Sequence, residues 1–155
     1  FERFLEACHR FIPDKDYQTL SNLPQPEHYM EKGRWHHFIE RWIQFDTSLR
    51  NEIVKVRAGR WQVEAETSIQ PTTYTGPSLA PVVAAATMST SLLEGEKILD
   101  DTRWKMLDEL AKAHYFDLDA LICYAYKLLI LHRWESIRSA DASLLLKEAL
   151  EPQEV

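Results

Sequence analysis

Apolar residues recur along this chain mostly with the period of an α-helix. Between residues 35 and 56 they return at steps of three and four, which places them in one continuous stripe on a helix. We therefore predict a long helix from Glu27 to about Trp61. Residues 1–12 show the same spacing and predict a short amphipathic helix. The proline-containing segment between these two helices is predicted to be a connection with one helical turn around residues 17–20.

The most apolar part of the chain is the stretch from residue 117 to 137, in which every position of 120–131 except Lys127 is apolar or aromatic. A helix that is apolar nearly all round must be covered on several sides, so we predict that this is the core helix. Asp117 is predicted to cap its first turn, because a carboxylate can accept hydrogen bonds from the free backbone amides there. The stem of Lys127 should lie along the bundle with its ammonium group in water.

A second helix is predicted just before the core helix. Ser91 and Glu94 have the spacing of a capping box, although Gly95 weakens this start. Only residues 114–116 separate the end of this helix from the core helix, so the two should form an antiparallel hairpin over residues 91–139.

Regular structure is not expected everywhere. A Thr/Pro-rich loop is predicted at about residues 63–81, and the alternation in 61–66 could form a short strand that would not persist alone. Small helices are predicted at 82–88 and 141–150, with frayed residues at 151–155. The fold class is therefore all-α: one domain, residues 1–155, built as an irregular helical bundle with a long helix and an antiparallel helical hairpin.

Composition narrows the function classes. The net charge of −6 with interspersed signs does not favour nucleic acid or an anionic membrane as partner. The longest apolar run has twelve positions and contains Lys127, whereas a membrane span needs about 20. Cys8 and Cys123 lie among apolar residues, as free thiols do in a reducing compartment, so we expect a cytoplasmic protein. Because the chain opens at Phe1 within an amphipathic stretch, we expect it to be a fragment of a longer protein.

All five tryptophans directly follow an arginine. The simpler interpretation is that each Trp lies at the margin of the core and each Arg reaches solvent or a carboxylate. The alternative is a protein interface, because Trp and Arg are enriched in binding hot spots. The residues predicted to contact a partner are Arg34, Arg41, Arg103, Trp104, Arg133 and Trp134.

Evidence for other chemistry is weak. Only Glu6 and His9 have the Glu-x-x-His spacing of di-iron bundles, and the side chains of the adjacent His36 and His37 are expected to diverge on a helix. His36 with Glu40 would supply at most two ligands, so no metal site is predicted. No phosphate-binding glycine motif or catalytic triad is recognisable, and no cofactor or small-molecule ligand is expected.

Several charged groups are predicted to be solvated. Asp46 with Arg50 and Glu52 with Lys55 have the spacing of helix-surface pairs. Asp100 and Asp101 are also expected to be solvated, because adjacent residues of a helix point in different directions.

Two stretches, residues 27–60 and 100–137, resemble an uncharacterised bacterial domain-of-unknown-function family encoded among V-type ATPase subunit genes. That family is distantly similar to the C, or d, subunits of V/A-type rotary ATPases, and the chain looks like its C-terminal half. The resemblance rests on the following residues: Arg103-Trp104-Lys105, Tyr115-Phe116, Arg133-Trp134, Asn51 and Arg60. Met106 stands where a second aromatic residue would be expected.

This resemblance implies a non-catalytic accessory or central-stalk-linking subunit of a V-type ATPase, which transports protons or sodium ions. Its partners would be other ATPase subunits, and it would be peripheral to the inner membrane through that complex. Two alternatives stay open on the residues alone: a metal-dependent helical-bundle enzyme, and a free-standing adaptor that binds a protein through its Arg-Trp surface.

Overall fold

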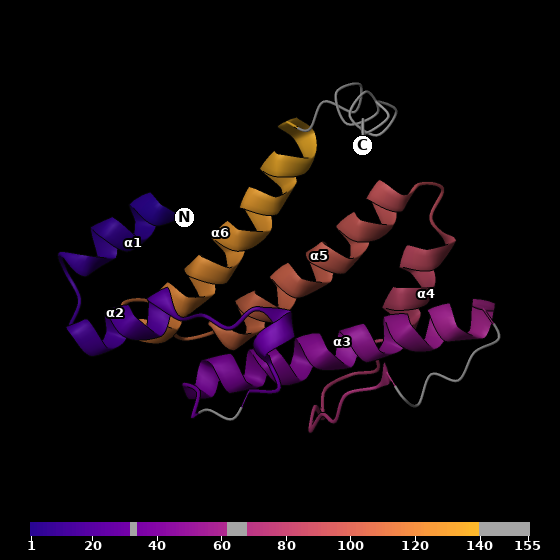
Figure 1. The fold of residues 1–155 in the computed structure, drawn as a ribbon, viewed down its shortest axis with the longest axis horizontal. Coiled ribbons are helices and arrows are strands. Elements are labelled where there is room, and N and C mark those ends of the chain that lie inside the picture. The colour runs from indigo at the N-terminus through magenta and orange to yellow at the C-terminus, as the bar shows by residue number, and fades with distance from the viewer. Residues whose placement is uncertain (32–33, 62–67, 140–155) are drawn as a thin grey trace, which may run out of the picture.

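The computed structural model describes residues 1–31, 34–61 and 68–139 (Figure 1). Within those ranges the chain forms six α-helices, one short 3-10 helix and no strand, which confirms the all-α prediction. The elements are α1 (Glu2–His9), α2 (Asp14–Ser21), η1 (Pro26–His28), α3 (His37–Trp61), α4 (Ala80–Met88), α5 (Leu92–Leu110) and α6 (Leu118–Ser139).

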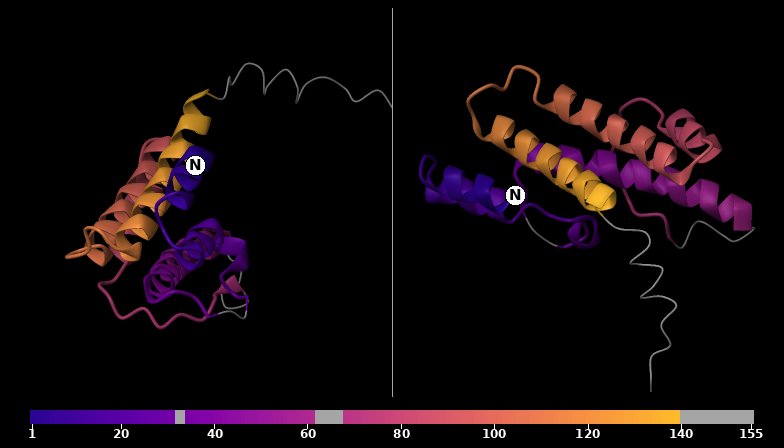
Figure 2. Two further views of the ribbon diagram at one scale, coloured as in Figure 1. Left: turned by 90° about the vertical axis from the view of Figure 1, so that its left-hand side faces the viewer. Right: turned by 90° about the horizontal axis from the view of Figure 1, so that it is seen from above.

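The helices α5 and α6 lie side by side and run in opposite directions above α3 (Figures 1 and 2). This confirms the predicted hairpin. The helix α4 packs against both α5 and α3, whereas α1 packs against α2, which in turn contacts α6. The core lies where these helices meet. Its most deeply buried side chains are Leu20, Phe38, Ile39, Phe45, Leu49, Val83, Leu107 and Ile122.

The predicted N-terminal caps of the two hairpin helices are largely confirmed. Ser91 Oγ accepts a hydrogen bond from the Glu94 amide at 3.1 Å, and Asp117 Oδ1 accepts one from the Ala120 amide at 3.0 Å. The reciprocal half of the capping box does not form, because the Glu94 carboxylate accepts from the Thr90 hydroxyl instead. The two caps therefore account for the starts of α5 and α6.

The long helix begins ten residues later than predicted, at His37 instead of Glu27. The phenol of Tyr29 donates to Asp46 Oδ2 at 3.1 Å. In one continuous helix these residues would be about 25 Å apart, at 1.5 Å per residue. The contact therefore requires the chain to fold back before α3 starts, and a sequence pattern does not show such tertiary contacts.

Two shorter predictions need correction. The helical turn expected at residues 17–20 is the complete helix α2, and α1 ends at His9, so that Phe11 is 85% exposed instead of lying on the apolar face. Gly95 does not mark a weak point in α5. A Cβ atom there would lie 2.6 Å from the carbonyl oxygen of Ala86, so glycine allows α4 and α5 to approach closely.

Residues 68–79 contain no α-helix or strand, in agreement with the predicted loop, and they are held against α3. Asn51 donates to the Gln70 carbonyl at 2.7 Å and accepts from the Gln70 amide at 2.9 Å. The expected helix at 141–150, the frayed end and residues 62–66 of the strand-like segment lie outside the described residues. Trp61, its first residue, ends α3.

The small helix predicted at 82–88 is present as α4, and both cysteines are buried free thiols. Among the helices that the structure describes, none combines the length and the apolar character required to cross a membrane.

Candidate functional site

A buried charge network connects the three long helices. Arg103 of α5 donates from Nε to Asp46 Oδ1 of α3 and from a terminal nitrogen to Asp100 Oδ1, both at 2.8 Å. Asp46 is 2% exposed and Asp100 is 4% exposed, so the prediction that both are solvated is wrong. Arg103 itself is buried. It therefore supports the bundle from inside and offers no contact surface for a partner.

The network fixes the charge state of Asp46. Burial by itself would raise the pKa of Asp46, but Arg103 and Arg50 hold it below its ordinary value. Burial together with the neighbouring Asp46 raises the pKa of Tyr29 far above the usual range of a phenol. Both groups therefore keep one protonation state around neutral pH, with Asp46 ionised and Tyr29 neutral.

Both tryptophans among the predicted contact residues line a groove between α5 and α6. Trp104 comes from α5 and Trp134 from α6, and Leu131 adds an apolar side chain that is 48% exposed. The groove encloses about 370 Å³. We call it the hairpin groove. The residues that line it are Lys97, Asp100, Asp101, Trp104, Ile130, Leu131, Trp134 and Arg138.

Side chains of the hairpin groove are held in place by polar contacts. The Trp134 indole donates from Nε1 to Asp100 Oδ2 at 2.8 Å, and Arg133 of α6 pairs with both Asp100 and Glu96 of α5. The Lys127 ammonium lies 4.8 Å from the centre of the Trp104 ring and also pairs with Asp108. These contacts agree with the prediction that the stem of Lys127 lies along the bundle. The two Trp rings are positioned before any partner binds.

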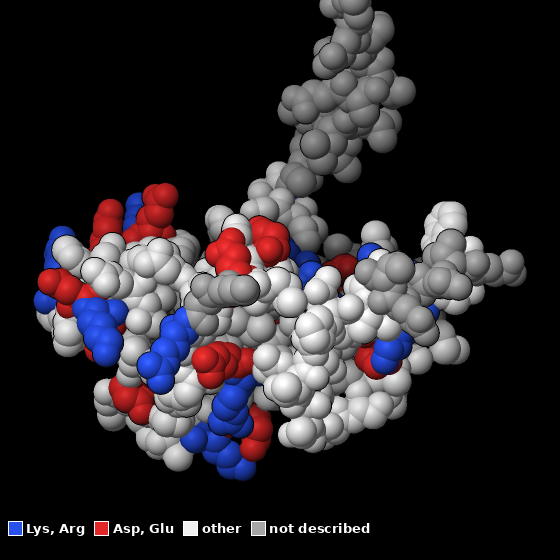
Figure 3. All heavy atoms as spheres, turned by 60° about the horizontal axis from the view of Figure 1, so that its bottom comes forward, with Lys and Arg blue, Asp and Glu red and all other residues white. Residues whose placement is uncertain are grey.

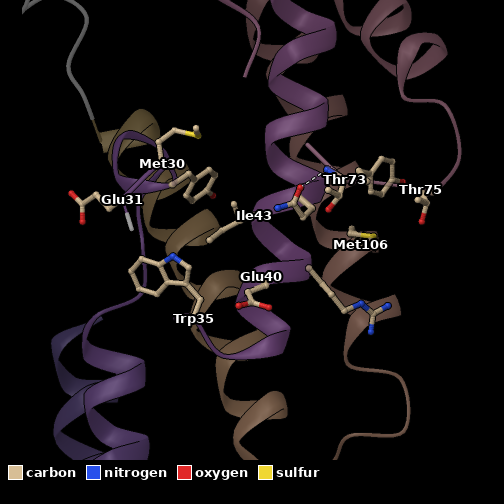
Figure 4. A pocket seen from close by; sticks show the side chains of 13 residues that line it. Met30, Glu31, Trp35, Glu40, Ile43, Thr73, Thr75 and Met106 are labelled. Atoms are coloured by element: carbon tan, nitrogen blue, oxygen red, sulfur yellow. Dashed lines mark hydrogen bonds between the residues drawn. The ribbon is translucent and has the colours of Figure 1, made fainter. Parts of the chain in front are cut away.

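The remaining predicted contact residues lie elsewhere. Arg41 lines a hollow of about 670 Å³ between the start of α3, the turn after η1 and residues 73–76 (Figure 4). In Figure 4, Trp35 and Met30 border that hollow. Arg34 lines a third, smaller hollow against α2. The Arg-Trp pairs therefore do not form one surface, and only Trp104, Arg133 and Trp134 lie together.

Positive and negative side chains are interspersed on the face shown in Figure 3, and no continuous basic area is seen there. This distribution agrees with the expectation from composition. It gives no support for binding to nucleic acid on that face.

A histidine cluster, which the sequence patterns did not predict, gathers around Asp119 in the first turn of α6. His36 Nδ1 lies 3.4 Å from Asp119 Oδ1, and His37 Nε2 lies 2.9 Å from Asp119 Oδ2. His114, from the connection between α5 and α6, places its Nε2 3.5 Å from the same Oδ2. Asp119 is buried. We call these four residues the His-Asp cluster.

The expectation that the side chains of His36 and His37 diverge is wrong. It assumed that both residues lie within a helix, whereas α3 begins at His37 and His36 lies in the non-helical segment before it. The two rings lie with their centres 4.3 Å apart, and both face Asp119. One ligand atom from each of His36, His37 and Asp119 can be chosen so that all three lie within 4.8 Å of one another.

A second carboxylate orients His114. Its Nδ1 is hydrogen-bonded to Asp117 Oδ2 at 2.6 Å. This hydrogen bond raises the pKa of His114, and it lowers the pKa of Asp117. Asp117 therefore has two roles, because its other oxygen caps α6.

When the chain is compared with known proteins, one family model matches part of it. The family model described as Protein of unknown function (DUF2764) matches residues 77–151. No curated protein matches the chain, and no solved structure matches it. The match includes α4, α5 and α6, and with them every residue of the hairpin groove. Of the two stretches that carried the resemblance, 100–137 lies within the match and 27–60 lies outside it.

Proposed function

We propose that this protein is a non-catalytic accessory subunit of a V-type ATPase, which links parts of the central stalk through protein contacts at the hairpin groove. One observation carries the proposal. The groove, with its two positioned tryptophans and the exposed Leu131, lies entirely within the residues that match the family model. The resemblance to a family encoded among V-type ATPase subunits supplies the identity of the complex.

The chemistry of the groove suits a protein partner. Trp and Arg contribute more than other residue types to binding hot spots, and a Trp that is already held in its bound position loses little conformational entropy on binding. The hydrogen bond from Trp134 to Asp100 and the Lys127 contact with Trp104 supply that preorganisation. Leu131 would then be covered by an apolar side chain of the partner.

The partner element that fits best is an amphipathic helix of another ATPase subunit. Two antiparallel helices leave a groove in which a third helix can pack. Among the described residues, the structure shows no ion pair for Lys97 or Arg138, which both line the groove. We therefore expect carboxylates beside the apolar face of the partner helix. In this arrangement the protein is cytoplasmic and peripheral to the inner membrane, and ATP is hydrolysed by other subunits.

The test uses the full-length protein purified from native membranes, with the associated subunits identified by mass spectrometry. Leu131→Glu places a charge in the lining of the groove and should remove most of the ATPase subunits from the purified material. Met88→Glu is the matched control, because Met88 is also an exposed apolar residue but lies at the end of α4. It should leave the recovery unchanged.

Recovery of the unmodified protein without any ATPase subunit would reject the proposed complex. An equal yield of ATPase subunits with Leu131→Glu and with Met88→Glu would reject the groove as the contact surface. Both variants must keep the helical circular dichroism spectrum of the unmodified protein, so that a loss of binding cannot result from unfolding.

A further inference from the structure

We propose that the His-Asp cluster is a binding site for a divalent transition metal ion of the zinc type, with His36, His37 and Asp119 as ligands and His114 as the adjacent fourth donor. This site is independent of the hairpin groove. It lies where the start of α3 meets the start of α6 and the connection that precedes it.

The distances from Asp119 to the histidines are close to those between two ligand atoms of a zinc site. Zinc binds imidazole nitrogen and carboxylate oxygen at about 2.0–2.2 Å, so two ligand atoms at the tetrahedral angle lie about 3.4 Å apart. The contact between His36 Nδ1 and Asp119 Oδ1 is 3.4 Å, and that between His114 Nε2 and Asp119 Oδ2 is 3.5 Å. His37, at 2.9 Å from Asp119, has to move back by a few tenths of an ångström, and the ligand atoms of His36, His37 and Asp119, which all lie within 4.8 Å of one another, have to draw together around the ion.

The charge of Asp119 also points to a cation. Its side chain is 6% exposed, and its ionic partners within the described chain are three histidines, with no lysine or arginine among them. A buried carboxylate is costly unless a positive charge compensates it. A metal ion bound between the rings and Asp119 would supply that charge.

The hydrogen bonds around the cluster suit metal binding at His114, whereas a metal ion at His36 Nδ1 would replace the contact that this nitrogen accepts from the Phe38 amide. His114 uses Nδ1 in its hydrogen bond to Asp117, so its Nε2 can present a lone pair toward Asp119. A carboxylate behind a histidine is the usual outer partner of a metal ligand, and it fixes both the tautomer and the orientation of the ring. His36 Nδ1 accepts a contact from the Phe38 amide at 3.4 Å, which marks it as the unprotonated nitrogen.

Access to the site is open from one side. The His37 side chain is 65% exposed and that of His114 is 35% exposed, whereas Asp119 forms the closed side. A metal ion can therefore enter from solvent past His37. Because the ligands come from α3, α6 and the connection before α6, the bound ion would clamp these elements together.

The site is tested by zinc binding to the full chain. Any affinity tag is removed first, and bound metal is stripped by a chelator that is then dialysed away. Isothermal titration with Zn²⁺ should give one ion per chain, and bound Co²⁺ should show the visible absorption of a four-coordinate site. His36→Ala and His37→Ala should each lower the affinity at least tenfold. His132→Ala is the control, because His132 is an exposed histidine of α6 that lies outside the cluster, and it should bind as the unmodified chain does.

Absence of zinc binding by the unmodified chain with zinc in large excess would overturn the proposal. An affinity for zinc that is unchanged by His37→Ala would also overturn the proposal. Zinc would then bind elsewhere on the chain, for example at the thiols of Cys8 and Cys123, which remain in that variant. His37 is largely exposed, so this variant is expected to fold. A thermal midpoint that rises on zinc addition in the unmodified chain but not in His37→Ala would support the proposal without relying on calorimetry.

Discussion

Arg103 of α5 and Asp46 of α3 form a buried ion pair in which Arg103 Nε lies 2.8 Å from Asp46 Oδ1. The other oxygen of Asp46 accepts from Arg50 at 2.8 Å and from the Tyr29 hydroxyl at 3.1 Å, so both carboxylate oxygens have partners. Asp100 accepts from a second nitrogen of Arg103. A buried pair of this kind sets the position of one helix on another, because any other register would leave a charge buried without a partner.

Removal of Arg103 should therefore destabilise the protein strongly. Arg103→Met keeps the length of the side chain but leaves Asp46 and Asp100 without their shared cation, and we expect a loss of about 3–5 kcal/mol in the free energy of unfolding. Urea unfolding followed by circular dichroism measures it. Lys55→Met breaks the exposed pair with Glu52 and should cost less than about 1 kcal/mol. Similar losses in the two variants would show that the buried pair does not hold the helices in register.

Stability should fall in acid because of Asp46. Its pKa in the folded protein is lower than the ordinary value of 3.8, so the unfolded chain binds the proton more readily. The contribution of the ionised carboxylate is thus complete above pH 3.8 and is lost as the pH falls toward the folded pKa. The urea midpoint should decrease from about pH 5 to about pH 3, and the decrease should be smaller in Asp46→Asn, which starts from lower stability. Equal slopes in the two proteins would contradict this assignment.

The helices could be predicted well where a single periodic face decides the structure. The hairpin of α5 and α6, with its caps at Ser91 and Asp117, follows from local rules that concern neighbours in the chain. The start of α3 could not be predicted in the same way. The apolar stripe itself begins only at Trp35, so the predicted start at Glu27 lay beyond the pattern. The hydrogen bond from Tyr29 to Asp46 requires the chain to fold back before α3. Tertiary contacts of that kind outweigh the small differences in helix propensity.

The functional residues show the same limit. The Arg-Trp pattern drew attention to Trp104 and Trp134, which line the hairpin groove, but it could not show that Arg103 is buried between two aspartates. Periodicity placed Asp46 and Asp100 on a solvated face because it carries no information on partners from another helix. The His-Asp cluster was missed for a similar reason, since its residues come from three separate segments. The sequence signal for it was the adjacent pair His36-His37, which lay inside the helix predicted from Glu27.

Glycine positions give a matched pair of substitutions. Gly95→Ala would place a Cβ atom 2.6 Å from the backbone oxygen of Ala86, so α4 and α5 must separate, and we expect a loss of about 1–3 kcal/mol. Gly59 lies in α3, and a Cβ atom added there would meet no heavy atom within 4 Å, so Gly59→Ala should stabilise the protein by about 0.5–1 kcal/mol through helix propensity. Thermal unfolding of both variants measures these effects. A stabilised Gly95→Ala protein would contradict the close approach of α4 and α5.

The two roles of Asp117 can be separated by two substitutions. Asp117→Ala removes both the cap of α6 and the partner of His114, and it should lower the stability and cost at least tenfold in zinc affinity. Asp117→Asn keeps a good capping oxygen but lacks the negative charge that orients and polarises His114, so its stability should be nearly unchanged while its zinc affinity still falls. Urea unfolding without zinc and calorimetric titration with zinc give the two readings. If Asp117→Asn bound zinc as tightly as the unmodified chain, Asp117 would act only as a helix cap, and the fourth position at the metal would belong to water instead of His114.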